Sequence, residues 1–249
     1  MNPQFRYAIS TFLLPLVAFR GRQLRKTVLR LPEASGSRTG VFSGTKEQIR
    51  IISIGESPIA GVGLNTQQEN LTYLLAQQIH QRNEQSVEWF ILGKTGLRIA
   101  EILPTFQHEL PAEADVLFVA MGVNDCKEMT SIRKWALEWR RLCLFLRQRY
   151  PKAAFVFSGA PPMASFPSLP WSVQTFLGSR ATVMNQALRK QIKSWPDVSF
   201  LPLPSFLSEE YFASDGFHPN AAAHRRWSQH LFEHLEQSTT VLQQKKATE

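Results

Sequence analysis

The amino-acid sequence predicts a mixed α/β protein built on a parallel sheet with helices on both faces. Short β-branched segments alternate with segments of helical spacing through most of the chain, an order typical of parallel sheets. The run at 115–121 is apolar almost throughout, as expected for a strand covered on both faces. With 249 residues, the chain can bury one sizeable core.

Five strands and five helices are expected in order along the chain. The strands are predicted at 49–54, 87–92, 115–121, 153–157 and 198–201. The helices are predicted at about 66–83, 98–108, 130–149 and 174–194. Pro219 is predicted to open a last helix to about 236, since proline is common at a first helical position. His224, His230 and His234 on this helix are expected to be solvated.

The predicted domain, 49–236, follows a basic leader and linker, 1–48, and precedes a polar tail, 237–249. Residues 1–50 carry nine Lys/Arg against two Glu, whereas 51–249 carry nineteen basic against eighteen acidic residues. The positive charge therefore lies in the leader, and the nearly neutral body argues against nucleic-acid binding. The two cysteines, Cys126 and Cys143, form neither a disulfide framework nor a metal-ligand spacing.

The leader contains an apolar run, 7–19, that is followed by a cluster of basic residues. As a helix this run would reach roughly 20 Å, short of the ~30 Å hydrocarbon core of a bilayer. Basic residues after the run oppose export. We expect residues 6–30 to attach a cytoplasmic protein to the anionic inner face of the cell membrane. The alternatives are a helix packed on the protein's own core and, less favoured, a membrane span or export signal.

Glycine-containing polar segments follow four of the predicted strands. Ser57 follows the first strand, Gly96 the second, Asn124 the third, and Asp215 with His218 the fifth. Catalytic and binding groups of parallel sheets gather at the carboxyl ends of the strands. A serine becomes a nucleophile when a base takes its proton and a third group orients that base. Ser57, His218 and Asp215 are the candidates for these three roles.

Acyl transfer also needs hydrogen-bond donors for the negative oxygen that develops on the substrate. The backbone N–H groups of Ser57 and Gly96 and the side-chain amide of Asn124 are the candidate donors. Alone, the segments around Ser57 and Asn124 are also typical of turns, and Asp-x-x-His before a helix is also typical of a helix N-cap. Together, at four strand ends, they indicate a serine carboxylic ester hydrolase.

The four segments resemble the sequence blocks of the SGNH hydrolase superfamily, also called GDSL-type esterases and lipases. Ser57 matches its serine, Gly96 its glycine, Asn124 its asparagine, and Asp215 with His218 its Asp-x-x-His block. The resemblance covers about residues 49–236, and segments 13–15 and 31–34 of the leader are similar to bacterial members. It implies a three-layer α/β/α sandwich with a five-stranded parallel sheet of the flavodoxin-like type, and no metal or organic cofactor.

One block departs from the family pattern. The family usually has Gly-Asp-Ser-Leu, whereas this chain has Gly55-Glu56-Ser57-Pro58. The acid gains a methylene group, and Pro58 cannot donate a backbone N–H. A membrane-bound module of the same fold without turnover is therefore an alternative to an active enzyme.

The segment 160–177 follows the fourth predicted strand and is rich in apolar residues, among them Met163, Phe166 and Trp171. These three are predicted to form the wall of an acyl-chain pocket, because ligand pockets are mostly apolar. The alternative is a loop packed on its own core. The predicted substrates are acyl esters such as lysophospholipids or monoglycerides. Carbohydrate O-deacetylation is the alternative activity.

Overall fold

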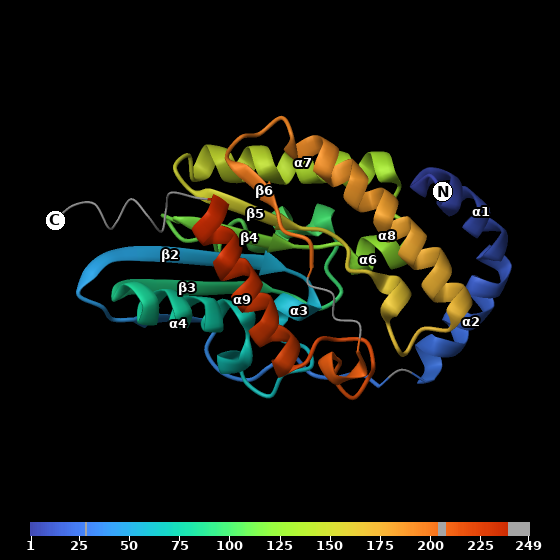
Figure 1. The fold of residues 1–249 in the computed structure, drawn as a ribbon, viewed down its shortest axis with the longest axis horizontal. Coiled ribbons are helices and arrows are strands. Elements are labelled where there is room, and N and C mark those ends of the chain that lie inside the picture. The colour runs from blue at the N-terminus through green and yellow to red at the C-terminus, as the bar shows by residue number, and fades with distance from the viewer. Residues whose placement is uncertain (28, 204–207, 239–249) are drawn as a thin grey trace.

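A six-stranded sheet lies between two layers of helices in the computed structural model, which describes residues 1–27, 29–203 and 208–238 (Figure 1). The strand order is β1-β3-β2-β4-β5-β6. This arrangement confirms the predicted α/β/α sandwich and adds one strand to the five that the sequence indicates.

The five predicted strands are all present and pair in parallel. They are β2 (Lys46–Gly55), β3 (Gln85–Gly93), β4 (Val116–Ala120), β5 (Ala154–Ser158) and β6 (Val198–Phe200). Every residue of β4 is buried, as its apolar run predicts. Because the strands are parallel, their carboxyl ends meet at one edge of the sheet, where the four polar segments also lie.

The additional strand, β1 (Thr39–Phe42), pairs antiparallel with β3 at the edge of the sheet. This segment was predicted to belong to the linker, because its surroundings are rich in Pro, Gly, Ser and Thr. The strand is short and partly exposed, so it carries no strong apolar pattern of its own. Gly40 lies against the indole of Trp89, where a Cβ atom would approach the ring to 2.7 Å. Contact with β3 therefore defines this strand.

The two faces of the sheet are covered by different helices. Along β2, Ile52 and Ile54 face one core cluster, whereas Ile49 and Ile51 face the other. This alternation is the period-two pattern of a strand. The first cluster packs against α5 (Ile102–Phe106), α7 (Ile132–Arg149) and α8 (Trp171–Ile192), and the second against α4 (Leu71–Asn83) and α9 (Ala221–Ser238).

Several short helical segments lie in the connections. They are α3 (Ser57–Ala60), η2 (Gln67–Glu69), η3 (Ile99–Glu101), α6 (Val123–Lys127), η4 (Met163–Ser165) and η5 (Glu209–Tyr211). The predicted helix at about 66–83 is thus divided into η2 and α4, and the one at about 98–108 into η3 and α5.

Helix α9 begins at Ala221 and not at Pro219. The Oδ1 atom of Asn220 accepts hydrogen bonds from the backbone N–H groups of Ala222, at 3.0 Å, and Ala223, at 3.1 Å. Asn220 therefore satisfies the N–H groups at the start of the helix. The proline stands just before this residue.

His224 is fully buried, so the expectation that it is solvated was wrong. Its Nδ1 atom accepts the backbone N–H of Leu71, at 3.1 Å. Leu71 is the first residue of α4, and the imidazole thus joins α9 to the start of that helix. The spacing of the histidines in the sequence could not show this, because it depends on how the two helices pack.

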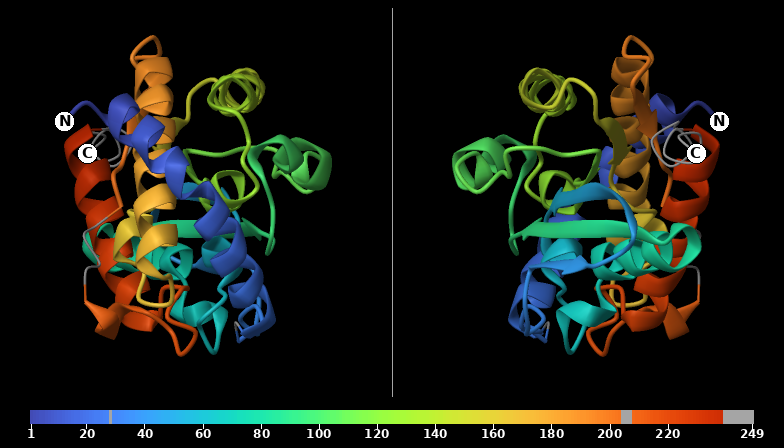
Figure 2. Two further views of the ribbon diagram at one scale, coloured as in Figure 1. Left: turned by 90° about the vertical axis from the view of Figure 1, so that its right-hand side faces the viewer. Right: turned by 90° about the vertical axis from the view of Figure 1, so that its left-hand side faces the viewer.

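The leader forms α1 (Pro3–Ser10), η1 (Thr11–Leu13) and α2 (Leu14–Thr27), which lie along α8 (Figures 1 and 2). One side of the leader thus packs on the protein's own fold. Within the described residues, no helix has the length and apolar character needed to cross a membrane. Of the predicted tail, 237–249, residues 239–249 lie outside the described part of the chain.

Candidate active site

Ser57 lies where β2 ends and α3 begins. Strand β2 ends at Gly55, and Ser57 is the first residue of α3, with its side chain 6% exposed. Pro58 occupies the next position, in the first turn, where a backbone N–H has no partner within the helix. The proline therefore fits the turn, and this departure from the family pattern leaves Ser57 at the carboxyl end of the strand.

Ser57, His218 and Asp215 form a hydrogen-bonded chain. The Oγ atom of Ser57 lies 3.0 Å from Nε2 of His218, and Nδ1 of His218 lies 2.6 Å from Oδ2 of Asp215. A carboxylate only accepts hydrogen bonds, so the proton of the neutral imidazole stays on Nδ1. The lone pair of Nε2 then faces the Ser57 hydroxyl, which is the arrangement a general base requires.

Asp215 is held in its charged form by its surroundings. Burial opposes the charge, but hydrogen bonds from His218 and Phe217 outweigh this and hold the pKa of Asp215 below its usual value. Its Oδ1 atom accepts the backbone N–H groups of Phe217, at 2.9 Å, and His218, at 3.0 Å. One loop therefore supplies both the imidazole and the carboxylate that orients it.

The carboxylate of Glu56, the residue before Ser57, is buried and anchors the start of α6. It accepts the backbone N–H groups of Gly122, at 2.9 Å, Val123, at 2.8 Å, and Asn124, at 3.0 Å. Burial raises the pKa of Glu56 to about 7, against the opposing effect of the hydrogen bonds from Val123 and Asn124. Glu56 thus connects the segment after β2 to the segment after β4.

Both side-chain N–H groups of Asn124 have acceptors in the structure. Nδ2 lies 2.5 Å from Oε2 of Glu56 and 3.1 Å from the carbonyl oxygen of Leu97, while Oδ1 accepts from Lys127 Nζ at 3.2 Å. Asn124 lies at the predicted strand end, but its amide does not present a free donor to the Ser57 side of the site. The longer side chain of glutamate reaches this amide, which the sequence pattern alone did not reveal.

Two backbone donors remain for an oxyanion. Within the described part of the chain, no hydrogen-bond acceptor is found for the N–H of Ser57 or of Gly96. Gly96 is exposed and has a φ of +82°, which favours glycine. Both groups lie where the sequence predicts them, after β2 and after β3.

Glu33 of the linker holds the loop that carries Gly96. Glu33 was not among the predicted site residues. Oε1 of Glu33 accepts from the backbone N–H of Thr95, at 2.8 Å, and from its hydroxyl, at 2.6 Å. Arg38 joins the second oxygen of Glu33, at 2.6 Å, to the carbonyl of Gly93, at 2.7 Å. The similarity of segment 31–34 to bacterial relatives was the only signal for this role.

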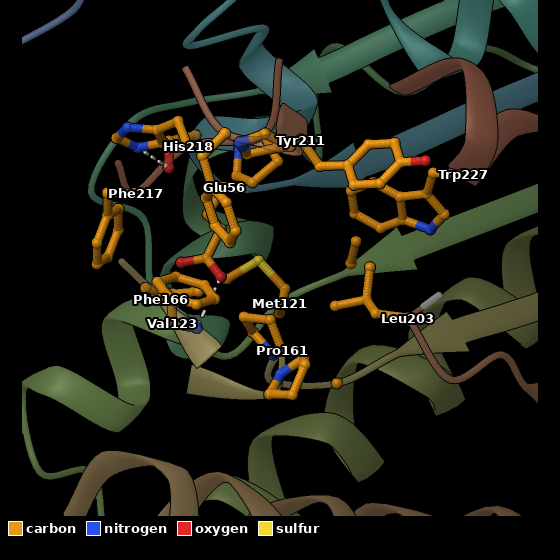
Figure 3. A pocket seen from close by; sticks show the side chains of 17 residues that line it. Glu56, Met121, Val123, Pro161, Phe166, Leu203, Tyr211, Phe217, His218 and Trp227 are labelled. Carbon is orange, nitrogen blue, oxygen red and sulfur yellow. Dashed lines mark hydrogen bonds between the residues drawn. The ribbon is translucent and has the colours of Figure 1, made fainter. Parts of the chain in front are cut away.

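A mostly apolar pocket opens beside Ser57 and His218 (Figure 3). Phe166 and Phe217 lie near His218, and Tyr211, Trp227 and Leu203 lie farther along the pocket. The ring of Phe166 packs edge-on against those of Phe212, at 5.3 Å, and Phe217, at 5.1 Å between centroids. These contacts form an aromatic wall next to the serine.

Of the three predicted pocket residues, only Phe166 lines this pocket. Met163 is fully buried in the core beneath it, and Trp171, the first residue of α8, is 64% exposed. The prediction for these two was wrong, because the apolar character of segment 160–177 does not show which side chains point inward. The other Phe, Tyr and Trp residues that line the pocket lie within 211–217 and at 227. Aromatic residues on both sides of the Asp-x-x-His block were therefore a sequence signal for the pocket that the prediction did not use.

Among the residues that the structure describes, no cluster of three or more His, Cys, Asp or Glu side chains is arranged to hold a metal ion. Cys126 and Cys143 are both buried free thiols. Burial raises the pKa of each thiol to about 12.

Residues 53–226 match the model of the GDSL-like lipase/acylhydrolase family, which is most of the chain and includes all four polar segments. The chain belongs to this family. It is accordingly a carboxylic ester hydrolase of the esterase and lipase type, and the resemblance to SGNH hydrolases is confirmed. No match was found among proteins with curated descriptions.

The fold of this family member is similar to those of solved esterases. A carbohydrate esterase family 2 enzyme with a carbohydrate-binding domain from Corynascus thermopiles (Myceliophthora fergusii) has a TM-score of 0.62 and 16% identity over 76% of this chain and 66% of its own. The aryl esterase of M. smegmatis has a TM-score of 0.58 and 19% identity over 77% of this chain and 100% of its own. The lipase Lip_vut3 from a goat rumen metagenome has a TM-score of 0.59 and 16% identity over 78% of this chain and 99% of its own.

Proposed function

We propose that the enzyme hydrolyses acyl esters such as lysophospholipids or monoglycerides through an acyl-enzyme on Ser57. The observation that carries this proposal is an aromatic, mostly apolar pocket directly beside the Ser57–His218 pair. A pocket of this kind gains free energy when it takes an apolar acyl chain out of water.

The reaction runs in two steps. Ser57 Oγ attacks the ester carbonyl carbon while His218 Nε2 takes the hydroxyl proton. His218 then gives this proton to the leaving alcohol, the ester C–O bond breaks, and the acyl group stays on Ser57. Water then attacks the acyl carbon while His218 Nε2 takes a proton from it. His218 returns this proton to Ser57 Oγ as the bond between Oγ and the acyl carbon breaks, and the carboxylic acid leaves. Asp215 orients the imidazole and stabilises its charged form in both steps.

The backbone N–H groups of Ser57 and Gly96 are the proposed donors to the oxyanion. Hydrogen bonds of this kind stabilise the tetrahedral intermediate more than the flat ester, and each contributes about 10²–10³ in rate. Asn124, the third predicted donor, has its amide N–H groups hydrogen-bonded to Glu56 and to the carbonyl oxygen of Leu97 in the structure.

Carbohydrate O-deacetylation is the second candidate. The similarity in fold to a carbohydrate esterase favours it. A sugar would need several polar partners, yet the side chains that line the pocket are mainly apolar or aromatic. An acyl chain therefore fits the pocket better than a sugar ring does.

The proposed substrates also suggest where the enzyme works. Lysophospholipids and monoglycerides reside largely in membranes, so an enzyme that hydrolyses them meets them at a bilayer surface. The proposed location is the cytoplasm, at the inner face of the cell membrane.

The test compares the wild type with Ser57→Ala on p-nitrophenyl esters from acetate to laurate, on a lysophospholipid and on acetylated xylan. We expect activity to peak at medium or long acyl chains and to fall at least about 10³-fold in Ser57→Ala, because Ser57 is the one serine or cysteine among the described residues that line the pocket. Ser194→Ala, at an exposed serine far along the chain, is the matched control and should retain full activity.

Each outcome separates the proposals. Activity that survives in Ser57→Ala would exclude this serine as the nucleophile. Turnover of acetyl esters alone, together with release of acetate from xylan, would replace the acyl-ester proposal with the deacetylase.

A further inference from the structure

The leader carries a row of exposed apolar side chains along its outer side. Phe5, Ile9, Phe12, Leu16 and Phe19 are 58%, 46%, 85%, 36% and 55% exposed, and together they form what we call the outer stripe. Their spacing of three and four residues places them on one face of the successive helices α1, η1 and α2. At 1.5 Å per residue the outer stripe extends over about 21 Å.

The opposite side of the leader is already packed on the protein. Ser10 Oγ lies 2.8 Å from Ser179 Oγ, and the hydroxyl of Tyr7 accepts from Arg180 Nη1 at 2.8 Å. The ring of Tyr7 also contacts that of Phe176, at 5.8 Å between centroids. Because these contacts fix the inner side on α8, the outer stripe cannot turn inward to join the core.

Arg180 makes this attachment firm. The guanidinium is buried and donates to the carbonyl oxygens of Cys126, at 3.1 Å, and Thr130, in addition to the Tyr7 hydroxyl. Cys126 lies in the last turn of α6, where carbonyl groups need donors. The leader is thus tied to the element that also carries Asn124.

The charged side chains around the outer stripe are all basic. Residues 1–27 contain no Asp or Glu and five basic residues. Arg22 and Lys26 are exposed and follow Phe19 at offsets of three and seven, so they continue the same face of α2. Arg6 is exposed beside Phe5.

We propose that this face docks the protein on a bilayer that contains anionic phospholipids. The phenylalanine side chains of the outer stripe enter the region between headgroups and acyl chains, and the basic residues contact the phosphate groups. A second copy of the chain is a poorer occupant, because a symmetric contact would bring two basic leaders together.

The docked face lies near the catalytic end of the sheet. The linker that follows α2 reaches the Gly96 loop within a few residues, through the hydrogen bonds of Glu33 with Thr95. Helices α1 and α2 also lie at the end of the molecule to which the β2 arrow points (Figure 1). Docking through the outer stripe would therefore bring the site close to a membrane-borne ester.

The test is co-sedimentation of the full chain with vesicles of phosphatidylglycerol and phosphatidylethanolamine at about 1:3, and with pure phosphatidylcholine vesicles. We expect binding to the anionic vesicles only, and weaker binding when NaCl rises from about 0.1 to about 0.5 M. The variant Phe5→Ser/Phe12→Ser/Phe19→Ser should lose at least about tenfold in vesicle binding, because the three apolar rings no longer enter the bilayer.

The matched control is Leu137→Ser/Leu144→Ser on α7. These leucines are 51% and 48% exposed on a helix that also carries several basic residues. The control should bind as the wild type does. If it loses binding while the triple phenylalanine variant keeps it, α7 is the docking face and the proposal is wrong.

Two further readouts distinguish bilayer docking from self-association and from unfolding of the variant. Light scattering without vesicles should show the same mass for the wild type and the triple variant, whereas a wild-type dimer that the variant loses would assign the outer stripe to a second copy. Circular dichroism should show that the triple variant is folded. Vesicle binding does not require ester hydrolysis, so this test of docking is independent of the proposed function. Ser57→Ala should therefore bind vesicles as strongly as the wild type does.

Discussion

At the scale of single residues, the acid before the catalytic serine candidate is longer than in the family pattern by one methylene group. Glu56 stands where the family pattern has aspartate, and its longer side chain reaches the amide of Asn124. The same carboxylate holds three backbone N–H groups at the start of α6. Glu56 therefore both positions the segment after β4 and occupies a donor that the pattern assigns to the oxyanion.

Shortening this side chain should release the amide. For Glu56→Asp we expect kcat on p-nitrophenyl butyrate to rise by up to about tenfold with KM unchanged, because Asn124 becomes free to donate to the transition state. Steady-state kinetics at neutral pH measure the effect. A lower kcat in a fully folded Glu56→Asp protein would contradict this account of Asn124.

Glu56→Gln is the control for this substitution. It keeps the length of the side chain but replaces one acceptor oxygen with a donor that faces backbone N–H groups. We expect its free energy of unfolding to fall by about 1–3 kcal/mol, since a buried donor is left without an acceptor. A gain in kcat confined to Glu56→Asp would separate release of the amide from a general loosening of the site.

At the scale of elements, the linker between the leader and the domain belongs to the site. The hydrogen bonds of Glu33 with Thr95 hold the loop between β3 and α5, in which Gly96 supplies a backbone N–H. This contact joins residues that are 62 positions apart in the sequence. The position of the Gly96 N–H therefore depends on a segment outside the predicted domain, 49–236.

Loss of the hydrogen bonds between Glu33 and Thr95 should lower kcat more than it weakens substrate binding. For Glu33→Ala we expect kcat to fall by about threefold to tenfold with KM nearly unchanged, because a displaced Gly96 N–H weakens binding of the transition state alone. Glu33→Gln keeps an acceptor for Thr95 and should retain most of the activity. Equal losses in both variants would show that the charge of Glu33 matters and not its hydrogen bonds with Thr95.

At the scale of the whole molecule, the sequence predicts the layers better than the connections. The five parallel strands follow from apolar runs that are intrinsic to each segment. Strand β1 and the inner face of the leader depend on contacts with β3 and α8, which no local pattern encodes. The same limit applies to the site. The positions of Ser57 and His218 relative to the strands were visible, whereas the partner of the Asn124 amide depends on side-chain reach.

The packing of α9 against α4 gives the global stability a dependence on pH. Burial lowers the pKa of His224 to about 3, so the imidazole stays neutral in the folded protein. In the unfolded chain it takes up a proton below about pH 6.5. Between these two values the unfolded state binds the extra proton, and the stability that the neutral imidazole provides is lost as the pH falls.

Replacing His224 should remove this dependence. We expect the free energy of unfolding of the wild type to fall, compared with that of His224→Gln, as the pH is lowered below about 6.5. The difference between the two proteins should change by up to about 1.4 kcal/mol per pH unit. Urea denaturation of both proteins at about pH 7, 6, 5 and 4 measures the difference, in which the titration of all other groups cancels. His108→Gln, at an exposed histidine, should follow the wild type at every pH. A difference between wild type and His224→Gln that stays constant with pH would mean that the buried imidazole accepts a proton without unfolding the contact between α9 and α4.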